Sequence, residues 1–472
     1  MNIIFFNTLS RSKEVFRPIK KGYAGIYTCG PTVYDYQHIG NFRTFLFEDF
    51  LKRVLLYNGY EVFHVMNITD VGHLTSDADE GEDKMELGSA RTGKSVWEIA
   101  EYYTKVFMED ASALNIIPPS VYTKATDYIK EQLEMIKCLE EKGYTYITSD
   151  GVYFDTSRFS DYGKLAQLDI SGLEEGIRVE FSTEKRNKTD FALWKFSPKD
   201  RKRQMEWESP WGIGFPGWHI ECSAMSRKFL GDTFDIHCGG IDHIPVHHTN
   251  EIAQSEACTG KKFVNYWMHG AFLEEEHGKM SKSKGEFLRL KLLCDRGYSP
   301  MDYRYLCLGT HYRKRLLFSW DILTTARNSL RRLRENIKNM RSDSIRASDK
   351  SNSSKVSEYR DAFIEAINDD LNMPQALAVM WDLVRDADVD NNLKLELIYD
   401  FDRVFGLQLN QDVTAGEIPD DVMEIVQKRA EARKEKNYRL ADELRDKVRQ
   451  MGYELIDRKD GFELKKISND QT

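Results

Sequence analysis

The chain lacks the features that mark membrane, secreted and strongly basic proteins. No apolar run approaches the roughly 20 residues that a membrane-spanning helix needs, so no membrane partner is expected. Residues 1–11 contain no signal-peptide core, which predicts a cytoplasmic protein. The 67 Lys and Arg residues are outnumbered by 76 Asp and Glu residues, which gives a formal net charge of −9. Any phosphate-binding surface must therefore be local.

Cysteine is scarce and follows no pattern. The chain has 7 cysteines, an odd number, and no CxxC motif. In a large cytoplasmic protein we expect no disulfides, and the simplest interpretation of each cysteine is a small buried apolar residue. They are Cys29, Cys138, Cys222, Cys238, Cys258, Cys294 and Cys307.

The length and the first elements indicate an α/β protein of several domains. With 472 residues, 41% of them hydrophobic, the chain exceeds one ordinary core, and two to four domains are expected. Alternation predicts a strand over 24–30, helical spacing follows His38 and stops at Gly59, and residues 60–69 form a second predicted strand. This β-loop-α-β order is how nucleotide-binding α/β folds begin.

The later chain departs from this pattern twice. Residues 72–83 are acidic and predict a surface loop, and residues 93–115 predict a helix. From about 117 to 205 the pattern is irregular and indicates an insertion. Beyond the insertion the α/β pattern resumes, with a predicted helix over 221–230, a strand over 233–237, a Gly-Gly turn at 239–240 and a helix over 247–258. From about 318 the chain is predicted to consist mostly of amphipathic helices, with a polar linker at 347–355 and a helical hairpin after about 418.

The segment from His38 to Asn41 (HIGN) lies between the first predicted strand and the first helix. The amino end of a helix attracts anions, and His38 adds a hydrogen-bond donor. Gly40 has no Cβ, so a base or a phosphate can approach the backbone. Taken alone, such a segment is more often a helix-capping turn.

The segment from Lys279 to Ser283 (KMSKS) places lysines among serines in a predicted loop. The simple interpretation is a solvated basic loop. The functional interpretation is a phosphate clamp in which Lys282 neutralises charge on departing pyrophosphate.

Together, HIGN and KMSKS resemble the signature pair of class I aminoacyl-tRNA synthetases. The resemblance implies that an amino-acid carboxylate attacks the α-phosphorus of ATP, with Mg²⁺ accompanying the nucleotide. Where the family usually has a second histidine, this chain has Asn41, which can donate to a phosphate oxygen but carries no charge. The implied catalytic residues are His38, Asn41, Lys279 and Lys282, and the implied ATP-binding residues are these four with Gly40 and Asp242.

A set of metal-ligand types bears on which amino acid is used. Two thiolates, an imidazole and a carboxylate can fill the first shell of Zn²⁺, and Cys29, Cys222, His247 and Glu251 supply them. The i, i+4 spacing puts His247 and Glu251 on one helix face. Spacing alone leaves the choice open, because four further candidates lie nearby: His219, Cys238, His243 and His248.

A second resemblance selects among these candidates. The motifs CGPTVY, KRNKTDFALWK and PGWHIECSAM resemble those of cysteinyl-tRNA synthetases, and the match covers nearly the whole chain. It implies one Zn²⁺ bound by Cys29, Cys222, His247 and Glu251, and this ion takes the thiolate of the substrate L-cysteine. A soft metal separates cysteine from serine better than the ~1–3 kcal/mol that size selection provides. No editing domain is then expected.

The same resemblance places Thr69 and Trp218 in the amino-acid pocket, although a plain core residue is the alternative for Trp218. Two departures stand out. Cys238 replaces a usual glycine and is a competing metal ligand, and the acidic insert after Asp70 interrupts a family motif.

The C-terminal part is expected to contact tRNA. Residues 326–346 contain seven Lys and Arg residues and two acids, which indicates either a solvated helix face or contact with tRNA phosphates. Tyr438 stands where the family often has Trp, and Leu464 where a Trp is expected. By position, the residues implied to contact the anticodon are Arg433, Tyr438, Asp442 and Asp457.

Two other functions fit the core motifs. A ligase that joins cysteine to an amino sugar shares the adenylating core and the zinc, but lacks the C-terminal module. A non-catalytic nucleotide-binding relative tends to lose a phosphate-handling residue, whereas His38, Lys279 and Lys282 are all present. The resemblance therefore favours a monomeric enzyme that attaches L-cysteine to tRNA(Cys), using ATP and a cysteinyl-adenylate intermediate.

The expected fold class is a Rossmann-like α/β nucleotide-binding catalytic domain with an inserted connective region, followed by a C-terminal α-helical bundle and a small anticodon-binding domain. The predicted boundaries are 1–116 and 206–270 for the two halves of the catalytic domain, 117–205 for the inserted region, 271–325 for the KMSKS loop and stem-contact region, 326–415 for the bundle and 416–472 for the anticodon-binding domain.

Overall fold

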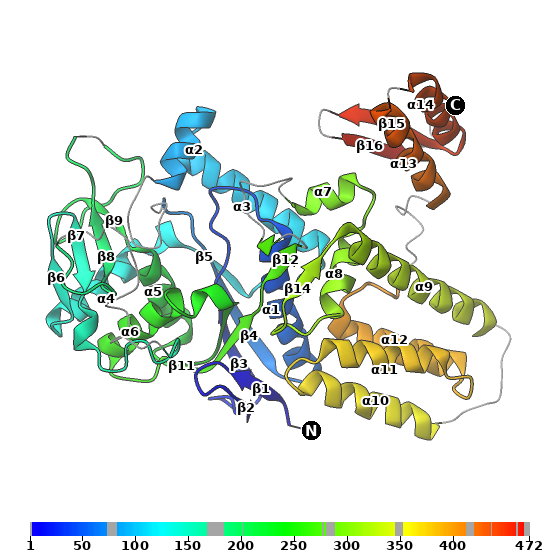
Figure 1. The fold of residues 1–472 in the computed structure, drawn as a ribbon. Coiled ribbons are helices and arrows are strands. Elements are labelled where there is room, and N and C mark those ends of the chain that lie inside the picture. Colours follow the sequence, from blue (N-terminus) through cyan, green and yellow to red (C-terminus); the bar gives the residue numbers. More distant parts are fainter. Residues whose placement is uncertain are drawn as a thin grey trace.

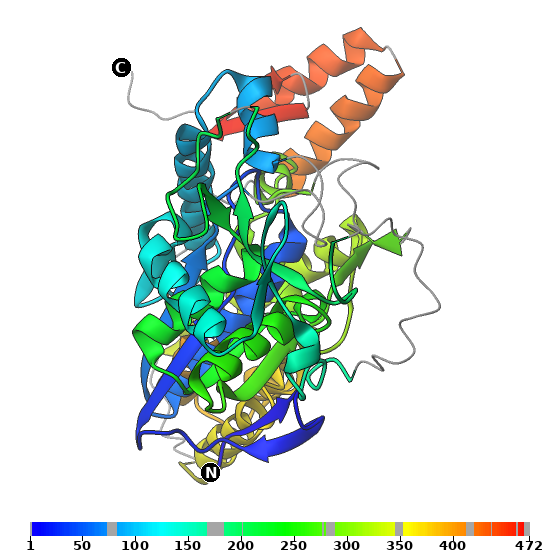
Figure 2. The same cartoon turned by 90° about the vertical axis from the view of Figure 1, so that its left-hand side faces the viewer.

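A central parallel sheet, an inserted antiparallel sheet, a helical bundle and a small C-terminal unit make up the molecule (Figure 1). The structure is a computed structural model that describes residues 2–72, 83–167, 184–200, 202–275, 278–279, 288–344, 353–411, 420–435, 437–458 and 461–466. The β1–β2 hairpin and the C-terminal unit lie at opposite ends of the molecule in both views (Figures 1 and 2). No helix in the described ranges has the length and apolar character needed to cross a membrane.

The central sheet has five parallel strands in the order β11-β10-β3-β4-β5. Successive side chains point to opposite faces, so Ile26 and Ile236 pack with the core around α1, whereas Tyr27 and Trp267 pack with α5 and α6. Both faces are covered, as parallel sheets require. This confirms the predicted Rossmann-like fold. The bounds are β3 (Tyr23–Thr28), β4 (Glu61–Ile68), β5 (Val121–Lys124), β10 (Phe234–Gly240), β11 (Val264–Gly270), α1 (Ile39–Tyr57), α5 (Trp218–Leu230) and α6 (His247–Thr259).

A second, antiparallel sheet is inserted between β5 and β10, on the left of Figure 1. Its strands follow the order β6-β7-β8-β9, and Trp194 lies fully buried in its core. Helix α4 covers it, while α2 and α3 come earlier, between β4 and β5. The bounds are α2 (Lys84–Thr92), α3 (Val96–Ala113), α4 (Ile129–Glu141), β6 (Thr145–Ile147), β7 (Gly151–Phe154), β8 (Phe191–Phe196) and β9 (Gly214–Pro216).

Two local expectations are wrong. Gly239 and Gly240 do not form a turn but extend β10, because β11 continues beside them and pairs with both. Disulfides are not absent either: Cys138 of α4 is bonded to Cys258 of α6, with the two Cα atoms 5.7 Å apart. The partners are 120 residues apart in sequence, and only the packing of α4 on α6 brings them together.

The rest of the described chain is mainly helical. Helices α9 to α12 form the bundle on the right of Figure 1, and α13, α14 and the hairpin β15–β16 form a C-terminal unit with its own small apolar core. The bounds are β1 (Ile4–Asn7), β2 (Ser12–Val15), β12 (Leu273–Glu275), β13 (Gly278–Lys279), α7 (Leu290–Asp295), α8 (Pro300–Leu308), β14 (Leu316–Phe318), α9 (Trp320–Ser344), α10 (Ser353–Asn368), α11 (Met373–Arg385), α12 (Asn391–Phe405), α13 (Asp420–Lys434), α14 (Tyr438–Gln450), β15 (Tyr453–Arg458) and β16 (Gly461–Lys466).

A buried ionic cluster joins the bundle to the catalytic domain. Arg304 of α8 and Arg53 of α1 both contact the carboxylate of Asp49, at 2.5 and 2.7 Å, and all three are buried. Arg304 also donates to the carbonyl oxygen of Phe405, the last residue of α12, at 2.6 Å. Gly406 follows with a φ of +64°, and a Cβ there would collide with both guanidinium groups. The cluster therefore fixes three helices at one point.

The Asp49 carboxylate should contribute strongly to stability. Burial alone opposes its charge, but Arg304 and Arg53 prevail and lower the pKa of Asp49 below its ordinary value. A carboxylate with a lowered folded-state pKa stabilises the fold above its unfolded pKa of about 4, and this contribution is lost as the pH falls through the folded value. We expect Asp49→Asn to reduce the free energy of unfolding by about 3 kcal/mol at neutral pH, because it leaves two buried arginines without a counter-charge.

Urea denaturation of both proteins across a pH series measures this effect. The difference between wild type and Asp49→Asn should narrow below about pH 4. Glu134→Gln, which breaks the exposed Lys130–Glu134 pair of α4, is the control and should change stability by less than about 0.5 kcal/mol. Equal midpoints for wild type and Asp49→Asn at neutral pH would contradict the role of the cluster.

Candidate metal and nucleotide site

The candidate site lies at the carboxyl edge of the parallel sheet, where open α/β folds bind their ligands. A cavity of about 330 Å³ opens there. The close approach of β3 and β4 shapes it: the Gly30 N–H donates to Oδ1 of Asn67 at 2.8 Å, and a Cβ on Gly30 would collide with the Asn67 carbonyl group. Among the residues that line the cavity are Cys29, Tyr36, His38, Asn41, Thr69, Trp218, Cys222, Asp242 and His247.

The HIGN segment forms the start of α1 and faces this cavity. His38 is the N-cap residue. Its Nδ1 accepts from the Asn41 backbone N–H at 3.1 Å, and the His38 backbone N–H donates to Oδ1 of Asn41 at 3.2 Å. This reciprocal pair is a capping box. Asn41 thus has a structural role that we did not predict, in addition to its place beside the cavity.

The structure brings the four predicted metal ligands together. Cys29 follows β3, Cys222 lies in α5, and His247 and Glu251 share one face of α6. One ligand atom from each lies within 4.8 Å of the others, and all four residues are buried. Nε2 of His247 is 3.1 Å from Oε1 of Glu251. Two sulfurs, a nitrogen and an oxygen at this spacing suit Zn²⁺.

The electrostatics favour the metal-binding, deprotonated form for Cys222 and Glu251, whereas burial raises the pKa of the Cys29 thiol. The hydrogen bond from Cys29 lowers the pKa of the Cys222 thiol to about 7, against the effect of burial. Burial opposes charge on Glu251 as well, but His237 and His247 lower its pKa to about 2. Burial also disfavours the His247 imidazolium, yet its hydrogen bonds to Cys222 and Glu251 raise its pKa to about 10. Without a metal, one proton on His247 therefore offsets one of the two negative charges of Cys222 and Glu251.

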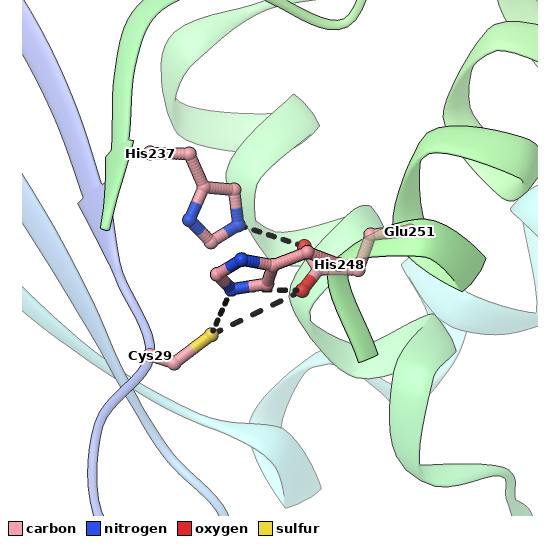
Figure 3. Close-up of side chains that lie close together, drawn as sticks. All are labelled: Cys29, His237, His248 and Glu251. Atoms are coloured by element: carbon pink, nitrogen blue, oxygen red, sulfur yellow. Dashed lines mark hydrogen bonds and ion pairs between the residues drawn. The ribbon is translucent and has the colours of Figure 1, made fainter. Parts of the chain in front are cut away.

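A second set of four residues offers ligands of similar chemistry (Figure 3). It shares Cys29 and Glu251 with the first set and adds His237 and His248. Figure 3 shows that His248 points at Cys29 and that His237 points at Glu251. Nε2 of His248 is 3.3 Å from Sγ of Cys29, and Nε2 of His237 is 2.9 Å from Oε2 of Glu251. Neither His237 nor His248 lines the cavity, whereas Cys222 and His247 do. Of the two sets, Cys29, Cys222, His247 and Glu251 is therefore the one with three residues at the cavity.

The two histidines of the second set act as supports. His248 is held on its other nitrogen by His269 at 2.8 Å, and His269 in turn contacts Oγ1 of Thr8 at 2.8 Å. Such outer contacts orient metal-binding side chains. His237 and His269 were not predicted, because β10 and β11 are buried almost throughout and a buried histidine in such a strand has no distinguishing spacing. Cys238, a predicted competitor, packs in the opposite core beside α1.

Thr69 and Trp218 both border the cavity, as the resemblance implied. The Trp218 ring lies 4.7 Å from the His247 ring, and the Thr69 hydroxyl accepts from Asn67 at 2.9 Å. Asp242 lines the cavity from the turn after β10. Gly40 lies in the first turn of α1.

The KMSKS segment is only partly described. Lys279 belongs to β13, which pairs with β12, and Lys282 lies outside the described residues. The chain just after the segment is fixed to the start of α1, because the Ile39 N–H donates to the Leu288 carbonyl oxygen at 2.8 Å. Leu288 is thereby held next to HIGN.

The predicted anticodon residues lie in the C-terminal unit but differ in their surroundings. Arg433 pairs with Asp457 at 2.6 Å, and Arg429 pairs with the same carboxylate, so Asp457 is already engaged. Tyr438 begins α14 with 61% of its surface exposed, and Asp442 follows one turn later, also exposed. Tyr438 and Asp442 present open surface with no such ion pair, whereas Arg433 is exposed but paired with Asp457.

Part of the basic segment 326–346 serves the bundle. Arg341 donates to the Tyr399 hydroxyl at 2.6 Å, Arg334 donates to the Leu407 carbonyl oxygen at 3.4 Å, and the Arg327 guanidinium lies over the Tyr298 ring at 4.8 Å. These contacts favour the structural interpretation for the three arginines.

Comparison with known proteins agrees with this architecture. The class I tRNA synthetase (C) catalytic domain family matches residues 15–328, and the DALR domain family matches residues 362–407. A solved methionyl-tRNA synthetase of Mycobacterium tuberculosis, in complex with methionyl-adenylate, shares the fold with a TM-score of 0.58 and 14% identity, over 82% of this chain and 90% of that one. The fold and site define a class I aminoacyl-tRNA synthetase.

Full-length relatives narrow the class. Cysteine--tRNA ligase 1 of Burkholderia lata is 52% identical over 98% of this chain and 97% of its own length. The cysteine--tRNA ligase of Treponema denticola is 46% identical over 97% and 98%, respectively. The chain belongs to the cysteine--tRNA ligase family.

The capping box generates a prediction about Asn41. Asn41→Ala removes the acceptor for the His38 N–H and should lower stability by about 1 kcal/mol. Asn41→Asp keeps that acceptor and adds a negative charge in the first turn of α1, so its melting temperature should equal or exceed that of wild type. Thermal unfolding followed by circular dichroism distinguishes the two. A loss of stability in Asn41→Asp as large as that in Asn41→Ala would show that the capping box is not what stabilises this turn.

Proposed function

We propose that the protein attaches L-cysteine to tRNA(Cys) with ATP, through a cysteinyl-adenylate intermediate, and selects cysteine by its thiolate. The observation that carries the proposal is the buried set of Cys29, Cys222, His247 and Glu251, three of which line the cavity. Full-length relatives at 52% and 46% identity are cysteine--tRNA ligases, which supports the same activity.

The donor set fits Zn²⁺. Cys29 and Cys222 supply soft thiolates, and the lowered pKa of Cys222 supports its deprotonated form near neutral pH. Bound Zn²⁺ supplies an attachment point that takes a thiolate in preference to a hydroxyl group. Trp218 and Thr69, beside the set, fill the space around a small side chain. Serine would lose the metal contact, which accounts for selection beyond the ~1–3 kcal/mol that shape provides.

The amino end of α1 supports the nucleotide role. The positive end of its helix dipole and the His38 side chain lie at the cavity and favour the phosphates of ATP. Asp242, across the cavity, has the chemistry to accept hydrogen bonds from the ribose. Gly40 permits close approach, and Lys279 and Lys282 neutralise the pyrophosphate as it leaves, with Mg²⁺ accompanying ATP. Asn41 adds no charge, so phosphate handling depends on His38 and the two lysines.

The tRNA role draws support from the C-terminal unit. Tyr438 can stack on an unpaired anticodon base, and Asp442 can accept hydrogen bonds from a base edge. Arg433 and Asp457 hold each other and position the hairpin β15–β16. A ligase that acts on an amino sugar has no use for such a unit.

The metal assignment predicts different outcomes for two variants. Cys222→Ser should abolish tight Zn²⁺ binding, because Cys222 belongs to the cavity-facing set. His248→Gln, in the second set, should retain the ion with an affinity reduced by about 10- to 100-fold. Elemental analysis of purified wild type and both variants, followed by chelator competition, measures this. Loss of zinc in His248→Gln alone would assign the ion to the second set.

Adenylate formation provides a test of the whole proposal. Wild type should catalyse cysteine-dependent ATP–pyrophosphate exchange and, with tRNA(Cys), form cysteinyl-tRNA. Lys282→Ala should slow exchange by about 100-fold while changing the Kd for cysteine by less than about twofold, since its charge acts on the departing pyrophosphate. Lys130→Ala, on the exposed face of α4, is the matched control and should behave as wild type. Exchange without any cysteinyl-tRNA product would favour the amino-sugar ligase, and absence of exchange would favour a non-catalytic nucleotide-binding protein.

A further inference from the structure

A cluster of three tyrosines lies at the mouth of the cavity and has no part in the functions described above. Tyr36, in the loop before α1, lines the cavity, and Tyr102 and Tyr103 belong to α3. The Tyr36 and Tyr103 ring centroids are 5.0 Å apart, those of Tyr102 and Tyr103 are 5.1 Å apart, and the Tyr36 and Tyr102 hydroxyl groups are hydrogen-bonded at 2.9 Å. The three rings therefore form one surface that continues out of the cavity.

The arrangement leaves aromatic surface available to a ligand. All three ring pairs are T-shaped, so no two rings are stacked face to face. Tyr102 keeps 44% of its surface exposed, which a tyrosine recruited only for packing would not need. Its hydroxyl contact with Tyr36 holds the exposed ring in place. Rigid, partly exposed rings next to a reaction site are suited to stacking on flat groups.

Cations border the same surface. The Arg289 guanidinium lies 4.2 Å from the Tyr36 ring centroid, and the Lys94 ammonium lies 5.2 Å from that of Tyr102. Arg289 follows the KMSKS segment by six residues and is next to Leu288, whose carbonyl oxygen accepts from the Ile39 N–H at the start of α1. Two acids lie close by: Asp35 interacts electrostatically with Tyr103, and Asp110 interacts with Arg289. Their negative charges offset those of Arg289 and Lys94. The ring faces, rather than net charge, are the main feature.

We propose that Tyr36, Tyr102 and Tyr103 form a stacking platform for the unpaired nucleotides at the 3′ end of the tRNA, an inference that rests on the proposed function. The reaction requires the terminal ribose to reach the cavity, and the bases before it must then cross the cavity mouth. Single-stranded nucleic acid binds to exposed aromatic rings with nearby cations, and stacking needs no base sequence. The cluster provides this chemistry at an edge of the cavity, because Tyr36 lines the cavity and also contacts Tyr102 of α3.

The test compares Tyr102→Ala with two controls. Tyr102→Phe keeps the ring and loses only the hydroxyl group. Trp97→Ala removes another exposed aromatic of α3, 46% exposed, that lies outside the cluster. Each protein is assayed for binding of tRNA(Cys) and of the same tRNA without its last three nucleotides, for transfer of cysteine to tRNA in a single turnover, and for cysteine-dependent ATP–pyrophosphate exchange.

We expect Tyr102→Ala to weaken binding of the intact tRNA and to slow transfer, each by about tenfold, the size of one lost stacking contact. Binding of the truncated tRNA and pyrophosphate exchange should stay within twofold of wild type. Trp97→Ala should behave as wild type, and Tyr102→Phe, which keeps the ring but loses the contact with Tyr36, should lose clearly less binding and transfer than Tyr102→Ala. Equal effects on intact and truncated tRNA, or no effect on either, would overturn the platform. Failure of the proposed function is distinct, because wild type itself would then show no cysteine-dependent exchange.

Discussion

The structure depends on holding two thiols and a carboxylate together in a buried site. Cys29, Cys222 and Glu251 lie within 4.8 Å of one another, and burial makes their negative charges costly unless a positive charge accompanies them. A proton on His247 offers one unit of compensation, and a divalent ion offers two. The balance of charge thus favours a metal bound by all four residues. The surrounding histidines, which donate to Glu251 and contact Cys29, keep these groups oriented toward that ion.

The fold places this site next to the amino end of α1. Cys29 directly follows the strand that leads into HIGN, so Cys29 and the helix terminus are separated by one short loop. The same helix carries Asp49 and Arg53, which meet Arg304 and the end of α12 inside the protein. One helix therefore connects the phosphate-binding end, the metal site and the helical bundle. Displacement of the bundle would act on α1 through the Asp49 cluster.

The sequence allowed prediction of those features that depend on local pattern. Strand alternation and helical spacing located β3, α1 and β4 to within a few residues, because each element has its own period and Gly59 ends the helix. Features created by contacts between distant segments were not predictable in this way. The support of Glu251 by His237 and the Cys138–Cys258 bond both depend on packing. The capping box is a local contact between His38 and Asn41, which the interpretation of HIGN as a helix-capping turn anticipated without naming the paired atoms.

The candidate site was likewise predictable from local pattern only in part. Spacing put His247 and Glu251 on one helix face, but it did not connect them with Cys29 and Cys222, which came from the family resemblance. The engagement of Asp457 by Arg429 and Arg433 could not be read from position either. Similarly, the tyrosine cluster joins the loop before α1 to α3, and neither segment has a motif of its own.

The central claim is that a zinc ion held by Cys29 and Cys222 recognises the substrate by its sulfur. X-ray absorption at the zinc edge counts the sulfur atoms bound to the ion in the intact protein. The account predicts two sulfur ligands for the protein alone or with L-serine, and three when L-cysteine is bound. An unchanged count of two with saturating L-cysteine would contradict it.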